Sequence, residues 1–316
     1  MAALPSLRQL RYLVAVAQHL NFTKAAEACF VSQSTLSTGL KELEQTMGVQ
    51  LIERDRQNVS VTPVGEEVVA RAIQLLAGAE DLIEYTHHTG HAMTGTIKLG
   101  AIPTIAPFLL PQVIPMIRQE YPDLRIALRE DLTANLLQRV VDHQLDFALI
   151  ALPYDTEGLL VKELYADEFW LTAPQGDPAL QEEEVTVPAK MAERLLLLEE
   201  GHCLREHSLR ACRKKEVANA DGLEATSLLT LVQMVESGLG ITLLPEMAVR
   251  SGILNNTHLQ ARPLSAPAPK RGIALVARQT TARIDEFLAI AQMIIEIHWH
   301  AQKKTQAQSV SGKSAR

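Results

Sequence analysis

The chain has 316 residues, of which 47% are hydrophobic and 21% are charged. This composition excludes a disordered or fibrous protein, and the length predicts two or three domains. The long apolar stretch over residues 97–117 contains Lys98 and four prolines, which excludes a membrane span there. The apolar core near the N-terminus, residues 12–17, is too short for a secretion signal, so we expect a cytoplasmic protein without membrane contact.

The net charge of −7 is unevenly distributed along the chain. Residues 1–62 carry six Lys and Arg against five Asp and Glu, residues 302–316 carry four basic residues and no acidic one, and the middle of the chain is acidic. An acidic body argues against non-specific polyanion binding but leaves room for a small DNA-reading surface. Three cysteines are too few for a disulfide scaffold, and we expect thiols in a reducing compartment.

The first 48 residues predict three short helices. Ser6 opens a capping-box pattern before the first helix, and Thr23 is expected to cap a second helix over residues 24–29. Ser32 is expected to cap the third helix, which ends at Gly48.

The third helix has one apolar face and one face of short polar side chains, the pattern of a helix that reads bases in the major groove. Gln can read an adenine edge, Ser and Thr can contact bases or phosphates, and Lys can reach the backbone. The same pattern fits a small helical interaction module with a solvated polar face. The candidate DNA-binding residues are Gln33, Ser34, Ser37, Thr38 and Lys41.

Two short β-rich runs follow, over residues 49–52 and 59–61, joined by a charged turn over residues 53–58. Arg54 and Arg56 lie in this turn, where they would form a wing against phosphate or the minor groove.

Thr62 and Pro63 have the pattern of an N-cap followed by proline at the first helical position. Apolar residues then recur at intervals of three and four, which suits a long helix that pairs with a copy of itself. A single amphipathic helix on a monomer is the alternative. The apolar seam consists of Val64, Val68, Ala72, Leu75, Ala79 and Leu82.

From Gly95 onward, strand and helix patterns alternate, which predicts α/β domains with parallel sheets. The length of this region and a break near Leu164 favour two lobes. The tail after Gln302 is rich in Gln, Ser and Lys, and we expect disorder there. Strands are expected over residues 96–101, 124–129, 145–152, 195–198, 240–244 and 272–277, and helices over residues 108–119, 134–142, 228–237 and 284–300.

Several motifs of the N-terminal region occur together: residues 22–27 (FTKAAE), 31–37 (VSQSTLS), 48–54 (GVQLIER) and 62–65 (TPVG). With these motifs the chain resembles the LysR-type transcriptional regulators over all but its tail. One departure is Ser34, where the family often has proline. Serine is compatible with the first helical turn, so this departure affects the base contacts rather than the fold.

The resemblance implies an α/β protein with an N-terminal winged helix-turn-helix, a long linker helix and a two-lobed effector domain like periplasmic binding proteins. It also implies double-stranded promoter DNA and RNA polymerase as partners, and self-association into a dimer or a tetramer made of two dimers. The expected parts are a DNA-binding domain over 1–62, a linker and dimerisation helix over 63–92, an effector domain over 93–301 and a disordered basic tail over 302–316. Within the effector domain, lobe I covers about 93–164 and 268–301, and lobe II covers about 165–267.

Cys203 and Cys212 stand in one of the most basic stretches of the acidic region, and Gly201 permits a helix to begin just before Cys203. Cationic neighbours and a helix N-terminus both favour a thiolate. From spacing alone, three interpretations remain open: two ordinary half-buried cysteines, a redox pair, or a zinc site that combines both cysteines with His202 and His207.

Residues 201–205 (GHCLR), Cys212, residues 224–228 (EATSL) and residues 240–245 (GITLLP) resemble the OxyR group, the hydrogen-peroxide-sensing LysR-type activators. The resemblance implies that Cys203 is the peroxidatic cysteine and that Cys212 resolves it as an intramolecular disulfide. His202 and Arg205 are then site residues, Cys29 is a core residue, and neither a cofactor nor a metal is expected.

Thr104 and Thr133 follow predicted strands at the start of predicted helices, where α/β folds place ligands. Helix capping explains such threonines equally well. The resemblance implies that both residues line the pocket that holds peroxide, where a hydroxyl can donate to and accept from hydrogen peroxide.

We therefore expect a DNA-binding activator of oxidative-stress genes that senses hydrogen peroxide through a reversible Cys203–Cys212 disulfide, and not an enzyme. One alternative is a LysR-type regulator that binds a small organic anion between its lobes. Another is a thiol peroxidase, although a catalyst has no need of a DNA-binding head. Steady-state consumption of peroxide would separate a sensor from a peroxidase.

Overall fold

The structure is a computed structural model of the chain. It divides into two compact units, which are described separately: residues 1–90 with 141–144, and residues 91–140 with 145–316. The residues described are 4–54, 58–88, 93–182, 185, 194–211 and 223–313.

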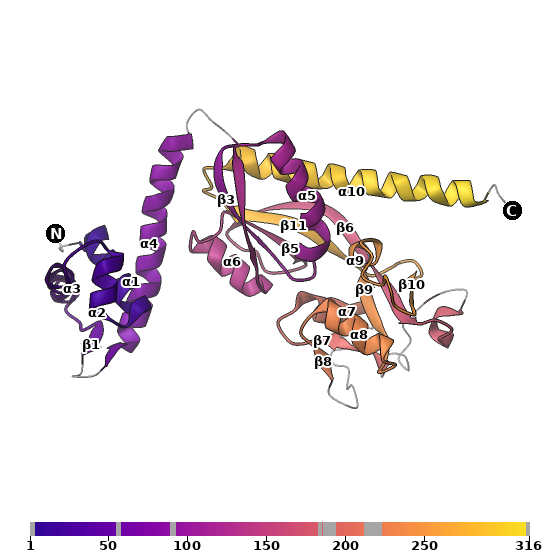
Figure 1. Ribbon diagram of the computed structural model, residues 1–316, viewed down its shortest axis with the longest axis horizontal. Helices are drawn as coiled ribbons and strands as arrows, with labels where there is room; N and C mark the ends of the chain where they lie inside the picture. Colours follow the sequence, from indigo (N-terminus) through magenta and orange to yellow (C-terminus); the bar gives the residue numbers. More distant parts are fainter. Residues whose placement is uncertain are drawn as a thin grey trace. The chain divides into compact units, whose positions relative to one another are not determined.

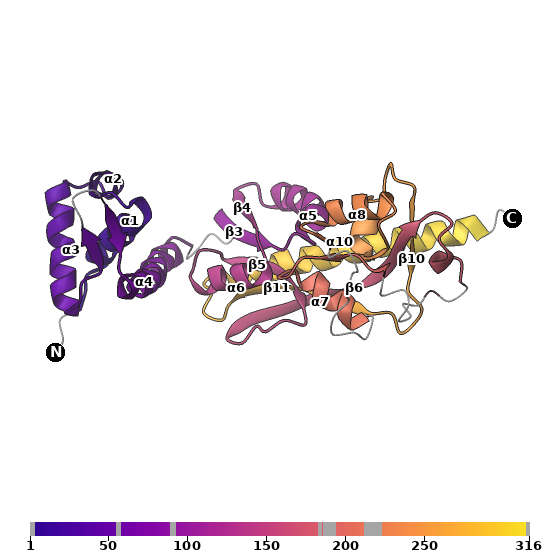
Figure 2. The ribbon, with the colours of Figure 1, turned by 90° about the horizontal axis from the view of Figure 1, so that it is seen from below.

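The first unit is a helical head with a small hairpin and a long helix. Its apolar core is formed by the three short helices together with Leu51, Ile52 and Ala72. The third helix lies on the side of the head away from the long helix (Figures 1 and 2). The elements are α1 (Leu7–His19), α2 (Phe22–Ala28), α3 (Gln33–Met47), β1 (Ile52–Arg54), β2 (Val59–Val61) and α4 (Pro63–His88).

The predicted start of α1 and both predicted ends of α3 are confirmed. Ser6 and Gln9 form a complete capping box, and the Ser32 side chain accepts a hydrogen bond from the backbone of Thr35. Gly48 ends α3 with a φ of +68°, a left-handed conformation that glycine adopts without steric cost.

Two local predictions in the head are wrong. The cap of α2 is Asn21, whose side chain accepts from the backbone N–H of Lys24, so the helix begins before Thr23. Strand β1 lies later than residues 49–52 and includes Arg54, because the hairpin register pairs Arg54 with Val59. Arg54 therefore ends a strand and does not lie in the turn.

The long helix α4 starts where predicted, since the Thr62 hydroxyl accepts from the Gly65 N–H at 2.9 Å. The residues of its apolar seam fall into two groups, one packed in the head and one exposed. Ala72 is buried in the core of the head, and Val68 packs against that core. Three seam residues remain exposed: Val64, Leu75 and Leu82.

The second unit is built on a seven-stranded sheet with the order β10-β6-β11-β5-β3-β4, with β9 paired to β6. In this sheet β3, β4 and β5 run parallel to one another, and the separate pair of β7 and β8 is also parallel. The expectation of parallel sheets is confirmed for these strands and is wrong for the rest of the large sheet. Strands β6, β9, β10 and β11 pair antiparallel. The strands are β3 (Gly95–Ala101), β4 (Leu124–Glu130), β5 (Phe147–Leu152), β6 (Leu159–Pro174), β9 (Thr242–Pro245), β10 (Leu259–Pro263) and β11 (Lys270–Arg278), with β7 (Leu197–Leu198) and β8 (Glu224–Ala225) pairing separately.

The two lobes have separate apolar cores. Strand β6 connects them and is continuous through Leu164, but its register with β11 skips this residue, because Ile273 pairs with Tyr165 and Ala274 with Glu163. It pairs with β11 as far as Glu168 and with β9 from Phe169 onward. Figure 2 shows β6 extending into the second lobe, where it lies beside β10. The predicted break near Leu164 is therefore an irregularity of register within a continuous strand, and the strand changes partners a few residues later.

Helices cover both lobes. In the first lobe α5 packs against α10 (Figure 1). Helix α10 continues through the segment expected to be a disordered tail, where residues 302–311 contain neither Pro nor Gly to end it. The helices are α5 (Ala106–Glu120), α6 (Thr133–Val141), α7 (Cys203–Ala211), α8 (Leu228–Glu236), α9 (Glu246–Arg250), α10 (Ile284–Lys313) and the 3-10 helix η1 (Pro178–Leu180).

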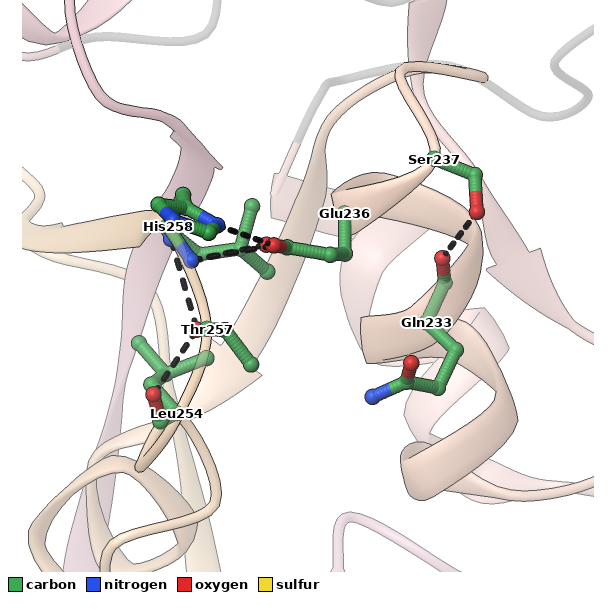
Figure 3. A network of polar contacts seen from close by, with 7 residues as sticks. Gln233, Glu236, Ser237, Leu254, Thr257 and His258 are labelled. Carbon is green, nitrogen blue, oxygen red and sulfur yellow. Dashed lines mark hydrogen bonds and ion pairs between the residues drawn. The ribbon is translucent and has the colours of Figure 1, made fainter.

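A polar network fixes the end of α8 to the loop before β10 (Figure 3). The Glu236 carboxylate accepts from the backbone N–H of His258 at 2.9 Å and lies 2.8 Å from Nδ1 of the same residue. The Thr257 hydroxyl donates to the Leu254 carbonyl at 2.7 Å.

Across the described residues, every helix falls short of the length and apolarity that a bilayer span requires.

Candidate functional site

Cys203 is the first residue of α7 and is 7% exposed. The chain reaches this position through Gly201, whose φ of +92° places it in the left-handed region. A Cβ at Gly201 would lie 3.0 Å from Leu132 Cδ1, so a larger residue would strain the backbone and force the Leu132 side chain to shift. The local sequence therefore directs the start of α7, with its thiol, into the first lobe.

A small cavity brings Cys203 together with three other predicted site residues, Thr104, Thr133 and His202. All four side chains are buried. Their own atoms nearly fill the cavity, which has no room for a water-sized molecule in this state.

Neither threonine caps a helix, so the helix-capping interpretation is wrong. The N-cap of α5 is Ile105 and has no side-chain cap bond, and Thr104 uses its hydroxyl elsewhere. Thr133 Oγ1 is buried and makes no hydrogen bond to any other described residue by strict geometry. Its hydroxyl is nevertheless close enough to Cys203 to lower the pKa of the thiol.

Arg271, from β11, is the cation of this site and was not predicted from the sequence. Its side chain is fully buried. Nη1 donates to Thr104 Oγ1 at 2.7 Å, and Nη2 donates to the Thr104 carbonyl at 3.0 Å. Nε and Nη2 donate to Oδ2 of Asp167 at 3.1 and 2.9 Å, so the guanidinium bridges a buried carboxylate and a cavity hydroxyl.

The electrostatics of Cys203 only partly match the expected thiolate. Burial raises the pKa of the Cys203 thiol, and this effect outweighs the others. The Arg271 charge, the Thr133 hydroxyl and the backbone N–H groups of Leu204 and Cys203 oppose it. The helix N-terminus therefore acts as predicted, but the closed site holds a protonated thiol.

The basic residues expected to activate Cys203 are engaged elsewhere. Arg205 donates to the Leu198 carbonyl at 3.0 Å and forms an ion pair with Glu224, which fastens α7 to β7 and β8. Arg210 pairs with Glu206 at 3.6 Å. Burial lowers the pKa of His202, which makes it a neutral neighbour of the thiol at neutral pH.

His207 lies one turn after Cys203 on α7 and is 6% exposed. Burial, together with the charges of Arg271 and Arg210, lowers its pKa to about 4, and a hydrogen bond to the backbone of Pro153 opposes this shift. Its Nδ1 is buried without a hydrogen-bond partner among the described residues. A neutral imidazole is therefore packed into the helix that carries the thiol.

The predicted partner of Cys203, Cys212, lies outside the described residues, as do Arg213, Lys214 and Lys215. Cys203 itself is a free thiol. Within the described ranges, no three His, Cys, Asp or Glu side chains converge as metal ligands.

On the head, the polar face of α3 is accessible. Gln33, Ser34, Thr38 and Lys41 are exposed, and Ser37 is half-buried. The Thr23 hydroxyl donates to Gln33 Oε1 at 3.4 Å, which orients that side chain. The Arg54 guanidinium lies 3.8 Å from the centroid of the Phe22 ring.

Two other predictions for the head concern Arg56 and Cys29. Arg56 falls outside the described residues. Cys29 is half-buried against the core of the head, and burial raises the pKa of its thiol.

Arg271 and Asp167 are the residues of the candidate site that the sequence analysis missed. Each is a charged residue next to or within an apolar strand run, where an unpaired charge is costly. Two opposite charges of this kind in neighbouring strands indicate a buried ion pair. Strand β6, which carries Asp167, was not predicted, so the ion pair of Asp167 with Arg271 could not be predicted either.

Two comparisons with known families cover most of the chain. Residues 7–66 match the family described as bacterial regulatory helix-turn-helix protein, lysR family. Residues 90–296 match the LysR substrate binding domain.

Individual relatives extend the likeness to nearly the full length. The HTH-type transcriptional regulator EstR of Acinetobacter baylyi is 44% identical over 94% of this chain and 98% of its own. A cysteine-to-aspartate variant of full-length OxyR from Pseudomonas aeruginosa has a TM-score of 0.73 and 35% identity, covering 92% of this chain and 98% of that one. An H2O2-bound cysteine mutant of OxyR from Corynebacterium glutamicum has a TM-score of 0.63 and 31% identity, covering 98% and 97%. With both of its family segments and its full-length relatives in agreement, the chain belongs to the LysR family of DNA-binding transcription regulators.

Proposed function

We propose that this regulator senses hydrogen peroxide at Cys203 and activates transcription after forming a reversible disulfide between Cys203 and Cys212. The observation that carries the proposal is a buried thiol that shares a cavity with two threonines, one of whose hydroxyls is held by the Arg271 guanidinium. These groups match the needs of a peroxide, which is small, uncharged and able both to donate and to accept hydrogen bonds. The name of one similar structure, the H2O2-bound OxyR mutant of Corynebacterium glutamicum, includes the same ligand and supports the proposal.

The first step oxidises Cys203 with hydrogen peroxide. The sulfur attacks one oxygen, the O–O bond breaks, and the leaving hydroxide takes up the thiol proton, which gives a sulfenic acid and one water molecule. Thr104 and Thr133 orient the peroxide, and Arg271 stabilises the negative charge on the attacking sulfur and on the departing oxygen. The closed cavity must open slightly to admit the peroxide, which keeps larger oxidants out.

The second step joins the two cysteines. The Cys212 sulfur attacks the sulfenic sulfur, an S–S bond forms, and hydroxide leaves with the Cys212 proton as a second water molecule. The two-step sequence consumes one peroxide and two thiols and yields one disulfide and two water molecules. A cellular dithiol reverses it by thiol–disulfide exchange.

The signal is then transmitted to DNA through self-association. The exposed seam residues Val64, Leu75 and Leu82 on α4 supply an apolar surface for a second copy of the chain. We place the DNA-binding part at residues 1–62, the linker at 63–92 and the sensing part at 93–301. Two dimers would form a tetramer whose heads bind promoter DNA, where the oxidised protein recruits RNA polymerase.

The rival proposals fit less well. A regulator of an organic anion needs an available cation between the lobes, whereas Arg271 is already bound to Asp167 and Thr104. A thiol peroxidase has no use for the helix-turn-helix head. The relative named EstR is the main argument for another inducer, because its name does not mention peroxide.

Mass spectrometry of the full chain before and after one equivalent of hydrogen peroxide tests the proposal. We expect the loss of two hydrogen atoms and a peptide that links Cys203 to Cys212. The Cys203→Ser variant should not react, whereas Cys212→Ser should trap a sulfenic acid at Cys203. Oxidation that starts at Cys212 or Cys29, or an unmodified chain, would overturn it.

A further inference from the structure

A second cavity, of about 300 Å³, lies in the effector unit between α5, β6, α9 and α10. It shares no lining residue with the Cys203 cavity. Apolar side chains form much of its wall, namely Phe108, Leu109, Met247 and Ile297. Its size and its largely apolar wall are those of a small-molecule site.

The charges on the wall of this cavity are paired within the protein. Arg250 binds Glu246 at 2.6 Å, and Asp167 binds Arg271 at 2.9 Å. Burial lowers the pKa of His298, which leaves its ring neutral at neutral pH. A charged ligand would have to break one of these ion pairs to gain a partner, so the cavity favours an uncharged ligand.

Asp167 offers the cavity one hydrogen-bond acceptor. Its Oδ1 accepts from the Met247 N–H at 3.0 Å, and its Oδ2 accepts twice from Arg271. A carboxylate has about four acceptor positions, so one position on Oδ1 is left for a ligand hydroxyl.

Aromatic faces complete the wall. The rings of Tyr165 and His298 are stacked with centroids 3.8 Å apart and planes 8° apart, and Phe108 lines the same space. Aromatic walls of this kind favour a flat ring in the ligand.

We propose that this cavity binds a small uncharged aromatic compound with one hydroxyl group, and that its binding accelerates the oxidation of Cys203 through Asp167 and Arg271. The second half of this proposal rests on the proposed function, whereas the binding itself does not.

The physical link is the buried pair of Asp167 and Arg271. A ligand hydroxyl that donates to Oδ1 takes up part of the negative charge of Asp167, so the carboxylate neutralises Arg271 less completely. The positive potential of Arg271 at Cys203 then increases, which favours the thiolate. Because Arg271 also holds Thr104, the effect reaches two members of the sensing cavity.

Binding is tested on the full chain with benzyl alcohol as the probe, by saturation-transfer NMR. Gln112 and Ser251 are exposed residues of the cavity wall, so Gln112→Trp and Ser251→Phe fill the mouth without replacing a buried side chain. Gln119→Trp makes the same change at an exposed position of α5 outside the cavity wall and is the matched control.

We expect benzyl alcohol to bind the parent chain and Gln119→Trp, and to lose binding in Gln112→Trp and Ser251→Phe. Benzoate and benzylamine, which carry a charge, should bind at least about tenfold more weakly. Equal binding of the charged and uncharged probes, or binding that survives both cavity-filling variants, would overturn the site.

The coupling is tested by the rate of Cys203 oxidation at saturating benzyl alcohol. We expect an increase of up to about tenfold, the gain in thiolate when a thiol pKa falls by one. The increase should persist in Gln119→Trp and disappear in Gln112→Trp. Binding without a change in rate would overturn the coupling, and a chain that peroxide never oxidises would overturn the proposed function while the NMR result still decides the site.

Discussion

Arg271 donates a hydrogen bond of 2.7 Å to the hydroxyl of Thr104, and neither side chain is more than 1% exposed. The bond joins positions 167 residues apart, one in the turn between β3 and α5 and one near the start of β11. Since Thr104 Oγ1 accepts from Arg271, its own hydrogen is available to a molecule in the Cys203 cavity. The same guanidinium is bound to Asp167, so this one buried group stabilises the fold and, under the proposed function, also activates Cys203.

The first prediction separates these two roles. Arg271→Met should lower the free energy of unfolding by about 3–5 kcal/mol, because Asp167 remains buried without its partner. The double variant Arg271→Met with Asp167→Leu should recover most of that loss, since two apolar side chains replace the pair. Chemical denaturation measures the stability, and quenched thiol labelling measures the rate of Cys203 oxidation.

We expect the double variant to remain as slow toward peroxide as the single one, because the cation is missing in both. Recovery of the oxidation rate together with stability would mean that Arg271 acts only by holding the fold.

The second prediction concerns the two threonines of the cavity, whose replacement should affect stability differently. Thr133→Val removes a buried hydroxyl that has no partner by strict geometry in the described part of the chain, so stability should be unchanged or slightly higher. Thr104→Val deprives Arg271 of an acceptor and should cost about 1–3 kcal/mol. Both variants should slow the oxidation of Cys203.

Thermal unfolding and oxidation rates of the two variants, measured in parallel, test this. A Thr133→Val protein that is strongly destabilised, or that reacts with peroxide at the parent rate, would contradict the assignment of its hydroxyl to the ligand.

The parts of this structure that could be predicted are those determined by neighbouring residues. The Ser32 cap, the Gly48 end and the Thr62-Pro63 start of α4 depend on hydrogen bonds within three or four residues. The Asn21 cap was missed although asparagine is a stronger capping residue than threonine, because the predicted helix started two residues too late.

The candidate site could be predicted only in part, because some of its residues are brought together by the pairing of distant strands. From spacing alone the motif around Cys203 left three interpretations open, and the family resemblance then indicated Cys203, His202, Thr104 and Thr133. The basic stretch suggested the wrong cations, because Arg205 is drawn to Glu224 by strand pairing that no local pattern reveals. Arg271 reaches Cys203 only through the order of strands in the sheet.

The third prediction concerns DNA. Gln33→Ala should lower affinity for the preferred site by about 1–3 kcal/mol and relax selectivity at one base pair, because Gln33 is exposed on α3. Arg54→Ala should weaken binding to all sequences alike and reduce the slope of log affinity against log salt by about one. Titrations of labelled duplexes at several salt concentrations measure both.

The opposite result for Arg54, altered sequence preference with an unchanged salt slope, would show that this arginine does not contact phosphate. Because its guanidinium also lies over Phe22, the thermal stability of Arg54→Ala serves as the control for a folding defect.

The fourth prediction is a pH dependence of α7. The pKa of His207 is about 4 in the folded chain against an ordinary value of 6.5, so the unfolded segment binds more protons between these two pH values. The stability of α7 should therefore fall as the pH drops from 6.5 toward 4, by up to about 3 kcal/mol. Hydrogen exchange of residues 203–211, corrected for the intrinsic rate, measures this.

His207→Gln keeps a polar side chain of similar size but does not titrate, so its α7 should lose most of this dependence. A parent-like dependence in the variant would assign the effect to other groups around the helix.

The last prediction follows from the length of α7. Nine residues, Cys203–Ala211, form one helix, which places the Cα atoms of its ends about 12 Å apart. Cys212 follows Ala211 directly, and one residue of chain adds at most about 3.8 Å, so the Cα atoms of the two cysteines stay at least about 8 Å apart. A disulfide requires about 4.4–6.8 Å, and therefore it cannot close while α7 is intact. Oxidation must therefore unwind part of α7. If the first turn unwinds, Arg205 is released from Glu224 and Leu198, and one bond can then reshape the second lobe. Hydrogen exchange should show protection over residues 203–211 in the reduced chain and its loss in the oxidised one. Equal protection in both, with the disulfide established by mass, would place the switch in another part of the molecule.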